Sequence, residues 1–192
     1  MSAQRPASLT PELLDSLVKR VPGSTGNASK LTEVYTGDLL VELPQSSEED
    51  VVQAVADARA AQAVWGSWSV KKRLKVMKKF HSLVIDNQML ITDLIQAESG
   101  KNRRMAFEET CDIPMGTSHY IKRAPTLLKD RKHAGPVPFL SYSTEVRRPK
   151  GVVALIAPWN FPFATGVSDP IPALIAGNGV VLRPDLQTTV TA

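Results

Sequence analysis

The chain has 192 residues, of which 43% are hydrophobic and 22% are charged, with a formal net charge of +4. This composition is typical of a folded domain and excludes a disordered tail, and a single cysteine excludes an internal disulfide and a cysteine-based zinc framework. The longest apolar run, residues 151–159, is far shorter than the roughly 18 residues of a membrane helix.

The first thirty residues predict a helical arm followed by a linker. Thr10 can cap a helix, Pro11 suits its first turn, and apolar residues recur as far as Val21. Residues 22–29 are polar and contain glycine and proline, so they end the helix. We assign residues 1–30 to this arm, and we expect no targeting peptide and a reducing, cytoplasmic location.

Residues 31–43 predict a pair of strands that turns at residues 36–38. Four helices are expected next, one after the cap Ser47, one after Ser69, one over 89–98 and one over 103–128. A left-handed glycine at Gly100 should end the third. Two internal prolines, Pro114 and Pro125, should bend or break the fourth.

The second of these helices carries a run of basic residues over 71–79 with no acid inside it. Such a run could bind nucleic acid through phosphates. However, Leu74, Met77 and Phe80 recur at helical spacing within and beside it. We therefore interpret the basic residues as the solvated face of an amphipathic helix, and nucleic acid as an unlikely partner.

The last third of the chain changes in character. Residues 135–138 are expected to form a stiff linker and residues 141–148 an exposed strand. Residues 151–157 and 179–182 are continuous apolar runs, which are typical of parallel strands buried on both faces. A helix over 172–176, ended by Gly177 and Asn178, joins them into a βαβ unit.

This unit predicts a binding crevice. Ligands of open α/β sheets bind beyond the carboxyl ends of the strands. Residues 158–160 leave the first strand there, and residues 183–185 leave the second. We therefore expect two polar exits to lie side by side at one edge of the sheet.

Other candidate sites are weak. Neither strand is followed by a GxGxxG fingerprint, and the three histidines lack the spacing of metal ligands, so no metal site is predicted. The acidic neighbours of Cys111, among them Glu109, disfavour a reactive thiolate, and we interpret Cys111 as a packing residue.

The pair Trp159 and Asn160 is more informative. An amide N–H at a strand end can stabilise negative charge that develops on a carbonyl oxygen, and an indole can form a wall for a flat cofactor. An asparagine that merely caps the loop would look the same in the sequence.

Taken together, three segments resemble the aldehyde dehydrogenase superfamily: 157–162 (APWNFP), 172–178 (PALIAGN) and 180–184 (VVLRP). Residues 35–37, the helix after Ser47 and residues 98–101 add earlier counterparts. The resemblance implies an α/β fold, the N-terminal part of a coenzyme-binding domain with a parallel Rossmann-like sheet, helices and a protruding β arm. It also implies a partial coenzyme-binding domain over 31–192, interrupted by an oligomerisation arm at 138–150.

The resemblance further implies oxidation of an aldehyde substrate to an acid with NAD or NADP, in a homo-oligomer. Asn160 is similar to the family's oxyanion-hole asparagine and is the expected catalytic residue. The residues expected to contact the coenzyme are Pro158, Trp159, Asn160, Arg183, Pro184, Asp185 and Leu186. The N-terminal arm and the Arg-Pro-Asp segment resemble most closely the succinate-semialdehyde dehydrogenase branch.

Two departures from the family pattern matter. Arg183 stands where the family has lysine, and Asp185 would favour a 2′-hydroxyl over a 2′-phosphate, so the sequence leaves NAD and NADP open. The family's nucleophilic cysteine and general-base glutamate belong to sequence that would follow Ala192. We therefore expect an N-terminal fragment that is inactive by itself and prone to self-association, or alternatively a non-catalytic nucleotide-binding or assembly module.

Overall fold

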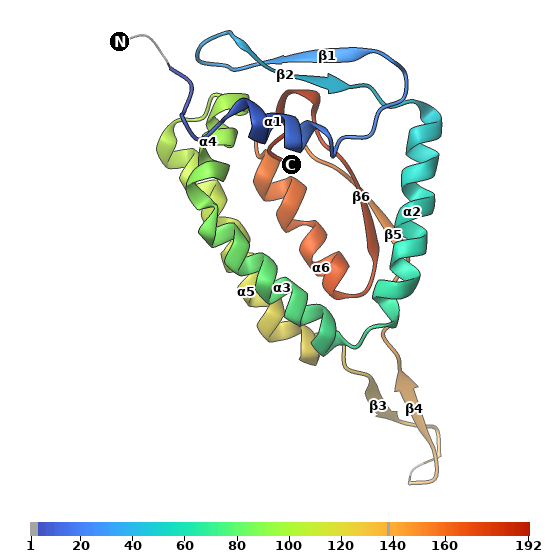
Figure 1. The fold of residues 1–192 in the computed structure, drawn as a ribbon. Helices are drawn as coiled ribbons and strands as arrows, with labels where there is room; N and C mark the ends of the chain where they lie inside the picture. Colours follow the sequence, from blue (N-terminus) through green and yellow to red (C-terminus); the bar gives the residue numbers. More distant parts are fainter. Residues whose placement is uncertain (1–3, 138) are drawn as a thin grey trace.

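Six α-helices and three two-stranded sheets make up the computed structural model, which describes residues 4–137 and 139–192 (Figure 1). The helices are α1 (Pro11–Val18), α2 (Glu48–Ser67), α3 (Val70–Asp86), α4 (Gln88–Ser99), α5 (Arg103–Leu127) and α6 (Pro170–Ile175). The strands are β1 (Ala28–Thr32), β2 (Leu39–Pro44), β3 (Arg131–Ala134), β4 (Tyr142–Glu145), β5 (Val152–Ile156) and β6 (Gly179–Arg183). The predicted α/β class is confirmed.

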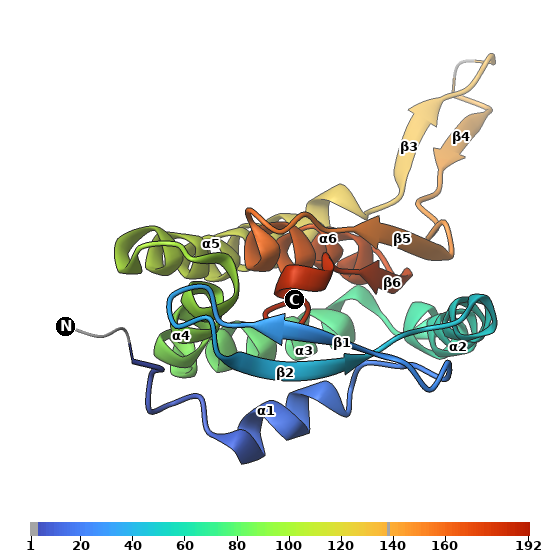
Figure 2. The same ribbon diagram turned by 90° about the horizontal axis from the view of Figure 1, so that it is seen from above.

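The N-terminal elements form a layer of their own, with α1 packed along the β1–β2 hairpin (Figure 2). The hydroxyl of Thr10 caps α1 by accepting the N–H of Leu13 at 3.3 Å. Leu14 is buried in a cluster with Leu31 and Leu43 of the hairpin. The first strand already begins at Ala28, so the last residues assigned to the arm belong to the hairpin.

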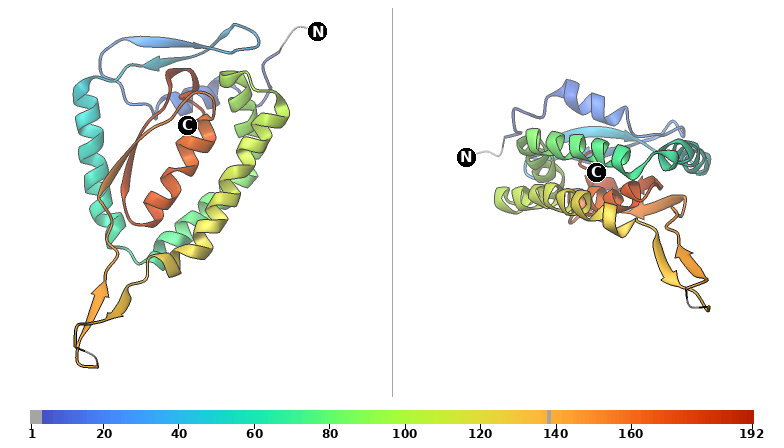
Figure 3. Two further views of the ribbon diagram at one scale, coloured as in Figure 1. Left: turned by 180° about the vertical axis from the view of Figure 1, so that it is seen from behind. Right: turned by 90° about the horizontal axis from the view of Figure 1, so that it is seen from below.

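The long helices α3 and α5 pack side by side and, with α6, enclose the main hydrophobic core (Figure 3). Of the two expectations for Pro114 and Pro125, a bend or a break in α5, the break was wrong, because the helix is continuous from Arg103 to Leu127. A proline removes one backbone hydrogen bond. The burial of Ala106 and Ile113 on the inner face of the helix offsets that loss, so tertiary packing overrides the local preference.

Strands β3 and β4 form an antiparallel hairpin that projects from the body of the molecule (Figures 1 and 2). The interpretation of 135–137 as a linker was wrong: this stretch lies in the hairpin turn, where the N–H of Gly135 donates to the carbonyl of Ser141 at 3.1 Å. Strand β3 was not predicted, because all its residues are exposed and carry no apolar pattern. Pro138, the expected start of the arm, lies outside the described residues.

The parallel pair β5 and β6 lies between α2 and α6 (Figures 1 and 3). The connection ends as predicted, with Gly177 in the left-handed region at φ 96°. The expectation that both strands would be buried on both faces was wrong, because Ala154 and Ile156 of β5 are exposed. The physical reason is that α2 covers only the amino-terminal part of their face, as the next section describes.

Candidate functional site at the carboxyl edge of the parallel strands

The exits of β5 and β6 lie next to each other. In the parallel register Ile156 pairs with Arg183, and the N–H of Ala157 donates to the carbonyl of Arg183 at 3.0 Å. Parallel strands paired in this way end at the same edge of the sheet. The loops that begin at Pro158 and Pro184 therefore leave the sheet together, and the predicted shared edge is confirmed.

The face of the strand pair that carries Ala154, Ile156 and Arg183 is open at this edge. Paired residues of parallel strands, and every second residue along each strand, share one face. Helix α2 covers the other end of that face, where a Cβ added to Gly179 would lie 2.6 Å from the carbonyl oxygen of Ala58. At the carboxyl edge Ile156 stays 78% exposed beside the exposed Arg183. An apolar surface flanked by a guanidinium suits a flat anionic ligand.

The loop after β5 presents the residues that the sequence analysis singled out. Pro158, Trp159 and Asn160 are all exposed, and the side chain of Trp159 is 56% accessible. The structure thus places the indole and the amide at the same edge of the sheet as Arg183.

The segment that follows β6 has both exposed residues and partly buried residues that shape the loop. Arg183 and Leu186 are exposed, whereas Pro184 and Asp185 are partly buried. Oδ1 of Asp185 accepts the N–H of Gln187 at 2.9 Å and caps the 3₁₀-helix η2 (Leu186–Thr188). One of its carboxylate oxygens is therefore already used to shape the loop.

Glu98 on α4 holds the segment that follows η2. Its two carboxylate oxygens accept the N–H groups of Val190 at 2.9 Å and Thr191 at 2.7 Å. The side-chain amide of Gln187 donates to the backbone carbonyl of Glu98 at 2.8 Å. Burial raises the pKa of Glu98 to about 7, although the backbone donors favour the charged form.

Glu109 on α5 plays a corresponding part behind the loop that follows β5, where its Oε1 accepts two backbone N–H groups. Sequence reasoning did not predict that either Glu98 or Glu109 would accept hydrogen bonds from the backbone of a distant loop. The available signal was an acid within a buried helical stripe: Glu98 follows the buried Leu94 and Ile95 by one turn. An acid in such a position requires hydrogen-bonding partners.

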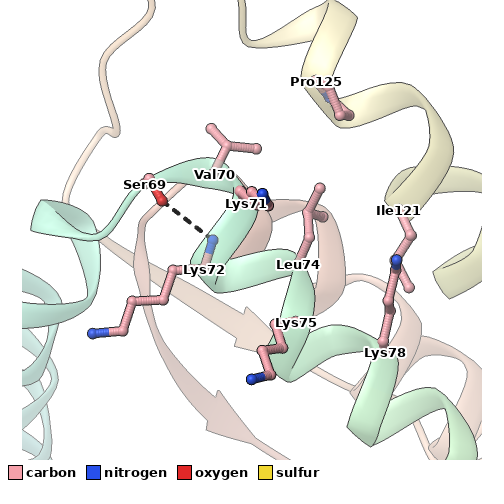
Figure 4. A pocket seen from close by; sticks show the side chains of 9 residues that line it. All are labelled: Ser69, Val70, Lys71, Lys72, Leu74, Lys75, Lys78, Ile121 and Pro125. Atoms are coloured by element: carbon pink, nitrogen blue, oxygen red, sulfur yellow. Dashed lines mark hydrogen bonds between the residues drawn. The ribbon is translucent and has the colours of Figure 1, made fainter.

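An open groove of about 1000 Å³ lies elsewhere, between α3 and α5 (Figure 4). It is lined by Ser69, Val70, Lys71, Lys72, Leu74, Lys75, Lys78, Ile121 and Pro125. The basic run lies on the predicted helix, with Leu74 and Met77 on its buried face. One cation departs from the prediction: Arg73 is buried, and its Nε donates to the carbonyl of Ile175 at 2.9 Å.

Two absences hold within residues 4–137 and 139–192, the part of the chain that the structure describes. No helix there has the length and apolar composition needed to cross a membrane. Nor do those residues bring three or more His, Cys, Asp or Glu side chains into a metal-binding group.

The fold is that of solved aldehyde dehydrogenases. An NAD-dependent benzaldehyde dehydrogenase from Corynebacterium glutamicum aligns with 89% of this chain and 37% of its own, with a TM-score of 0.81 and 29% identity. An NADP-dependent glyceraldehyde-3-phosphate dehydrogenase from Bacillus halodurans C-125, complexed with NADP, aligns with 88% and 36%, with a TM-score of 0.82 and 25% identity. The architecture is therefore that of the N-terminal domain of an aldehyde dehydrogenase.

The sequence agrees with the fold. The model of the aldehyde dehydrogenase family matches residues 21–192, and the chain belongs to that family. A protein of Mycobacterium ulcerans (strain Agy99), named as a candidate succinate-semialdehyde dehydrogenase with NADP(+), is 41% identical over 97% of this chain and 36% of its own length. A similarly named Mycolicibacterium smegmatis protein is 42% identical over 82% of this chain and 31% of its own. The chain thus spans about a third of the length of these relatives, and its resemblance to that branch is confirmed.

Proposed function

We propose that this chain supplies the coenzyme crevice and the oxyanion-stabilising asparagine of an NAD(P)-dependent aldehyde dehydrogenase that oxidises succinate semialdehyde to succinate. The observation that carries the proposal is the parallel pairing of β5 with β6, which brings Trp159, Asn160 and Arg183 to one edge of the sheet. Membership of the family and the names of its relatives support the reaction and the substrate.

The residues at this edge fit a dinucleotide. Ile156 offers an exposed apolar surface, Trp159 an exposed ring and Arg183 a cation. When bound, NAD(P) would accept hydride from the aldehyde carbon. A guanidinium about 4 Å from a phosphate charge contributes about 4 kcal/mol at an effective dielectric constant of about 20, and the carboxylate of Asp185 would oppose a 2′-phosphate. Because Arg183 would favour and Asp185 would oppose a 2′-phosphate, we propose NAD or NADP as the coenzyme.

Within this proposal Asn160 is the catalytic residue. Its exposed side-chain amide can donate a hydrogen bond to the aldehyde oxygen as negative charge develops there. A donor placed in this way lowers the barrier by about 3 kcal/mol.

We further propose that the 192 residues alone do not turn over substrate. The sulfur of Cys111 accepts a hydrogen bond from the side-chain amide of Gln88 at 3.2 Å on the neighbouring helix α4, which suits a packing role. The expected result is no aldehyde-dependent formation of NAD(P)H. Reproducible turnover by the wild-type chain would contradict this proposal, and turnover that survives Asn160→Ala would also contradict the role assigned to Asn160.

Calorimetric titration with NAD and NADP tests the crevice. We expect saturable binding that weakens at least about tenfold in Trp159→Ala and in Arg183→Ala, because each removes a contact surface at the edge. Phe107→Ala and Arg104→Ala, exposed residues of α5, are the matched controls and should leave binding unchanged. A larger loss for NADP than for NAD in Arg183→Ala would assign the guanidinium to the 2′-phosphate. Wild-type protein that binds neither coenzyme would refute the proposal.

The β3–β4 hairpin favours a second function in assembly. The projecting element begins at Arg131, before the arm predicted over 138–150. Leu140 is 86% and Tyr142 69% exposed on an element that projects from the body (Figure 2). We propose that this hairpin binds a second copy of the chain. We also propose that residues 31–192 form the partial coenzyme-binding domain, on which α1 of the N-terminal arm packs.

Light scattering tests the assembly proposal. The wild-type chain should form oligomers, and Leu140→Ser with Tyr142→Ser should reduce them. Val52→Ser, at a 69% exposed position on α2, is the control. A monodisperse wild-type monomer would exclude assembly through the hairpin.

A further inference from the structure

The loop that carries Asn160 is held from behind by a carboxylate of another helix. Oε1 of Glu109 on α5 accepts the N–H of Phe163 at 2.8 Å and the N–H of Ala164 at 3.0 Å. The Glu109 side chain is fully buried. Asn160 is only three residues before the first of these two donors, so its backbone is fixed by β5 on one side and by Glu109 on the other.

Lys101 contacts both Glu109 and the loop, and we call the pair of Glu109 and Lys101 the Glu109 anchor. Its ammonium group forms an ion pair with Oε2 of Glu109, and the lysine side chain is 11% exposed. The same ammonium lies 3.9 Å from the ring centroid of Phe161, a cation–π contact to the residue directly after Asn160. The two charges thus contact the loop on both sides of Pro162: Lys101 at Phe161 and Glu109 at Phe163.

The anchor supplies hydrogen-bond acceptors that the loop does not provide from its own side chains. The chain turns into a π-helical segment, η1 (Ala164–Ser168), whose start has no side-chain cap of its own. The first N–H groups of a helix lack partners within it and need an acceptor. Glu109 supplies that acceptor from 54 residues away in the sequence.

We propose that Glu109 is a positioning residue that sets the place of the Asn160 amide, with Lys101 orienting its carboxylate. This inference rests on the role of Asn160 proposed above. Glu109 does not itself contact substrate or coenzyme in the proposed mechanism. If Glu109 only stabilised the fold as a whole, replacing it would loosen the loop and the hydrophobic core to the same extent. If it positions the loop, replacing it loosens the loop more than the core.

Amide hydrogen exchange of the ¹⁵N-labelled 192-residue chain separates these two roles. In Glu109→Gln we expect the amides of Phe163 and Ala164 to exchange at least about tenfold faster, because both donate to Glu109, while the core amide of Ile113 keeps its rate. The side-chain amide resonances of Asn160 should shift at the same time. Glu108→Gln, at the neighbouring exposed position, is the matched control and should change neither.

Milder variants keep the test decisive if Glu109→Gln does not fold. Glu109→Asp retains the charge but shortens the reach, and Lys101→Gln retains the carboxylate but removes the cation. Both should loosen the loop selectively, whereas Lys101→Arg should restore protection relative to Lys101→Gln. Equal acceleration at Ile113 and at the loop, or no change in any variant, would overturn the inference.

Coenzyme titration of the same samples distinguishes this inference from the proposed function. If wild-type protein binds neither coenzyme but Glu109→Gln still loosens the loop and shifts the Asn160 resonances, the proposed function fails and the anchor stands. If coenzyme binds and the loop does not respond to Glu109→Gln, the positioning role fails and the proposed crevice stands.

Discussion

Each of the segments that follow β5 and β6 is held by a buried glutamate that accepts two backbone N–H groups, but among the residues that the structure describes only one of the two glutamates has a cation as partner. Behind the first, Glu109 accepts two backbone N–H groups and pairs with Lys101. Behind the second, Glu98 accepts two backbone N–H groups, but no ion pair to it is found in residues 4–137 and 139–192. A buried carboxylate without a cation favours its protonated form. The two anchors should therefore respond differently to pH and to mutation.

The largest expected effect is the pH dependence of the Glu98 anchor. The folded protein holds the Glu98 proton up to a pKa of about 7, whereas the unfolded chain releases it near 4.5. Between these values the folded state binds more protons at Glu98, so the contribution of this group to stability falls as the pH rises from about 4.5 to about 7, and that contribution is constant outside the window. The loss amounts to about 3 kcal/mol, because one pKa unit corresponds to about 1.4 kcal/mol.

Urea unfolding of wild type and Glu98→Gln at pH 4.5 and pH 8 measures this effect. The free energy of unfolding of the wild type should decrease by about 3 kcal/mol relative to that of the variant as the pH rises. Glu108→Gln removes an exposed carboxylate from α5 and should show no such difference. A constant difference between wild type and Glu98→Gln at both pH values would contradict the role of burial.

The next effect concerns the compensated anchor. Lys101→Met leaves the buried carboxylate of Glu109 without its cation and should lower the free energy of unfolding by about 2 kcal/mol at pH 7. This is below the usual cost of breaking a buried pair, because two N–H groups still bind Glu109. Arg104→Met breaks the exposed Arg104–Glu108 pair and should cost less than about 1 kcal/mol. Equal costs for the two variants would show that the Lys101 pair is no stronger than a surface pair.

The smallest effect tests a neutral contact of the Glu98 anchor. Gln187→Ala removes the hydrogen bond to the Glu98 carbonyl and should destabilise the protein by about 1 kcal/mol without changing its pH dependence. Gln53→Ala removes an exposed contact to Asp57 within α2 and serves as the control. Chemical denaturation at pH 4.5 and pH 8 gives both the free-energy differences and their pH dependence. A change in pH dependence in Gln187→Ala would contradict the prediction and indicate that this contact affects the charge environment of Glu98.

Local signals predicted much of the fold. Thr10, Ser47 and Gly100 each mark a helix end as expected, because caps and left-handed glycines depend on neighbouring residues only. The exposed strand β3 carries no apolar pattern and was missed. Arg73 was predicted to be solvated like the lysines, but its guanidinium is buried and donates a hydrogen bond to the carbonyl of Ile175 at the end of α6.

The candidate site shows the same division. The sequence alone determined the two strands, the helix between them, and the exits at Trp159, Asn160 and Arg183, because periodicity and the parallel βαβ connection fix these features. Only the tertiary structure decided that Ile156 lies on an open face and that Glu109 and Glu98 anchor the exits. The donors of these two carboxylates lie up to 55 and 93 residues away along the chain, and no local pattern specifies which backbone N–H groups will meet a buried charge.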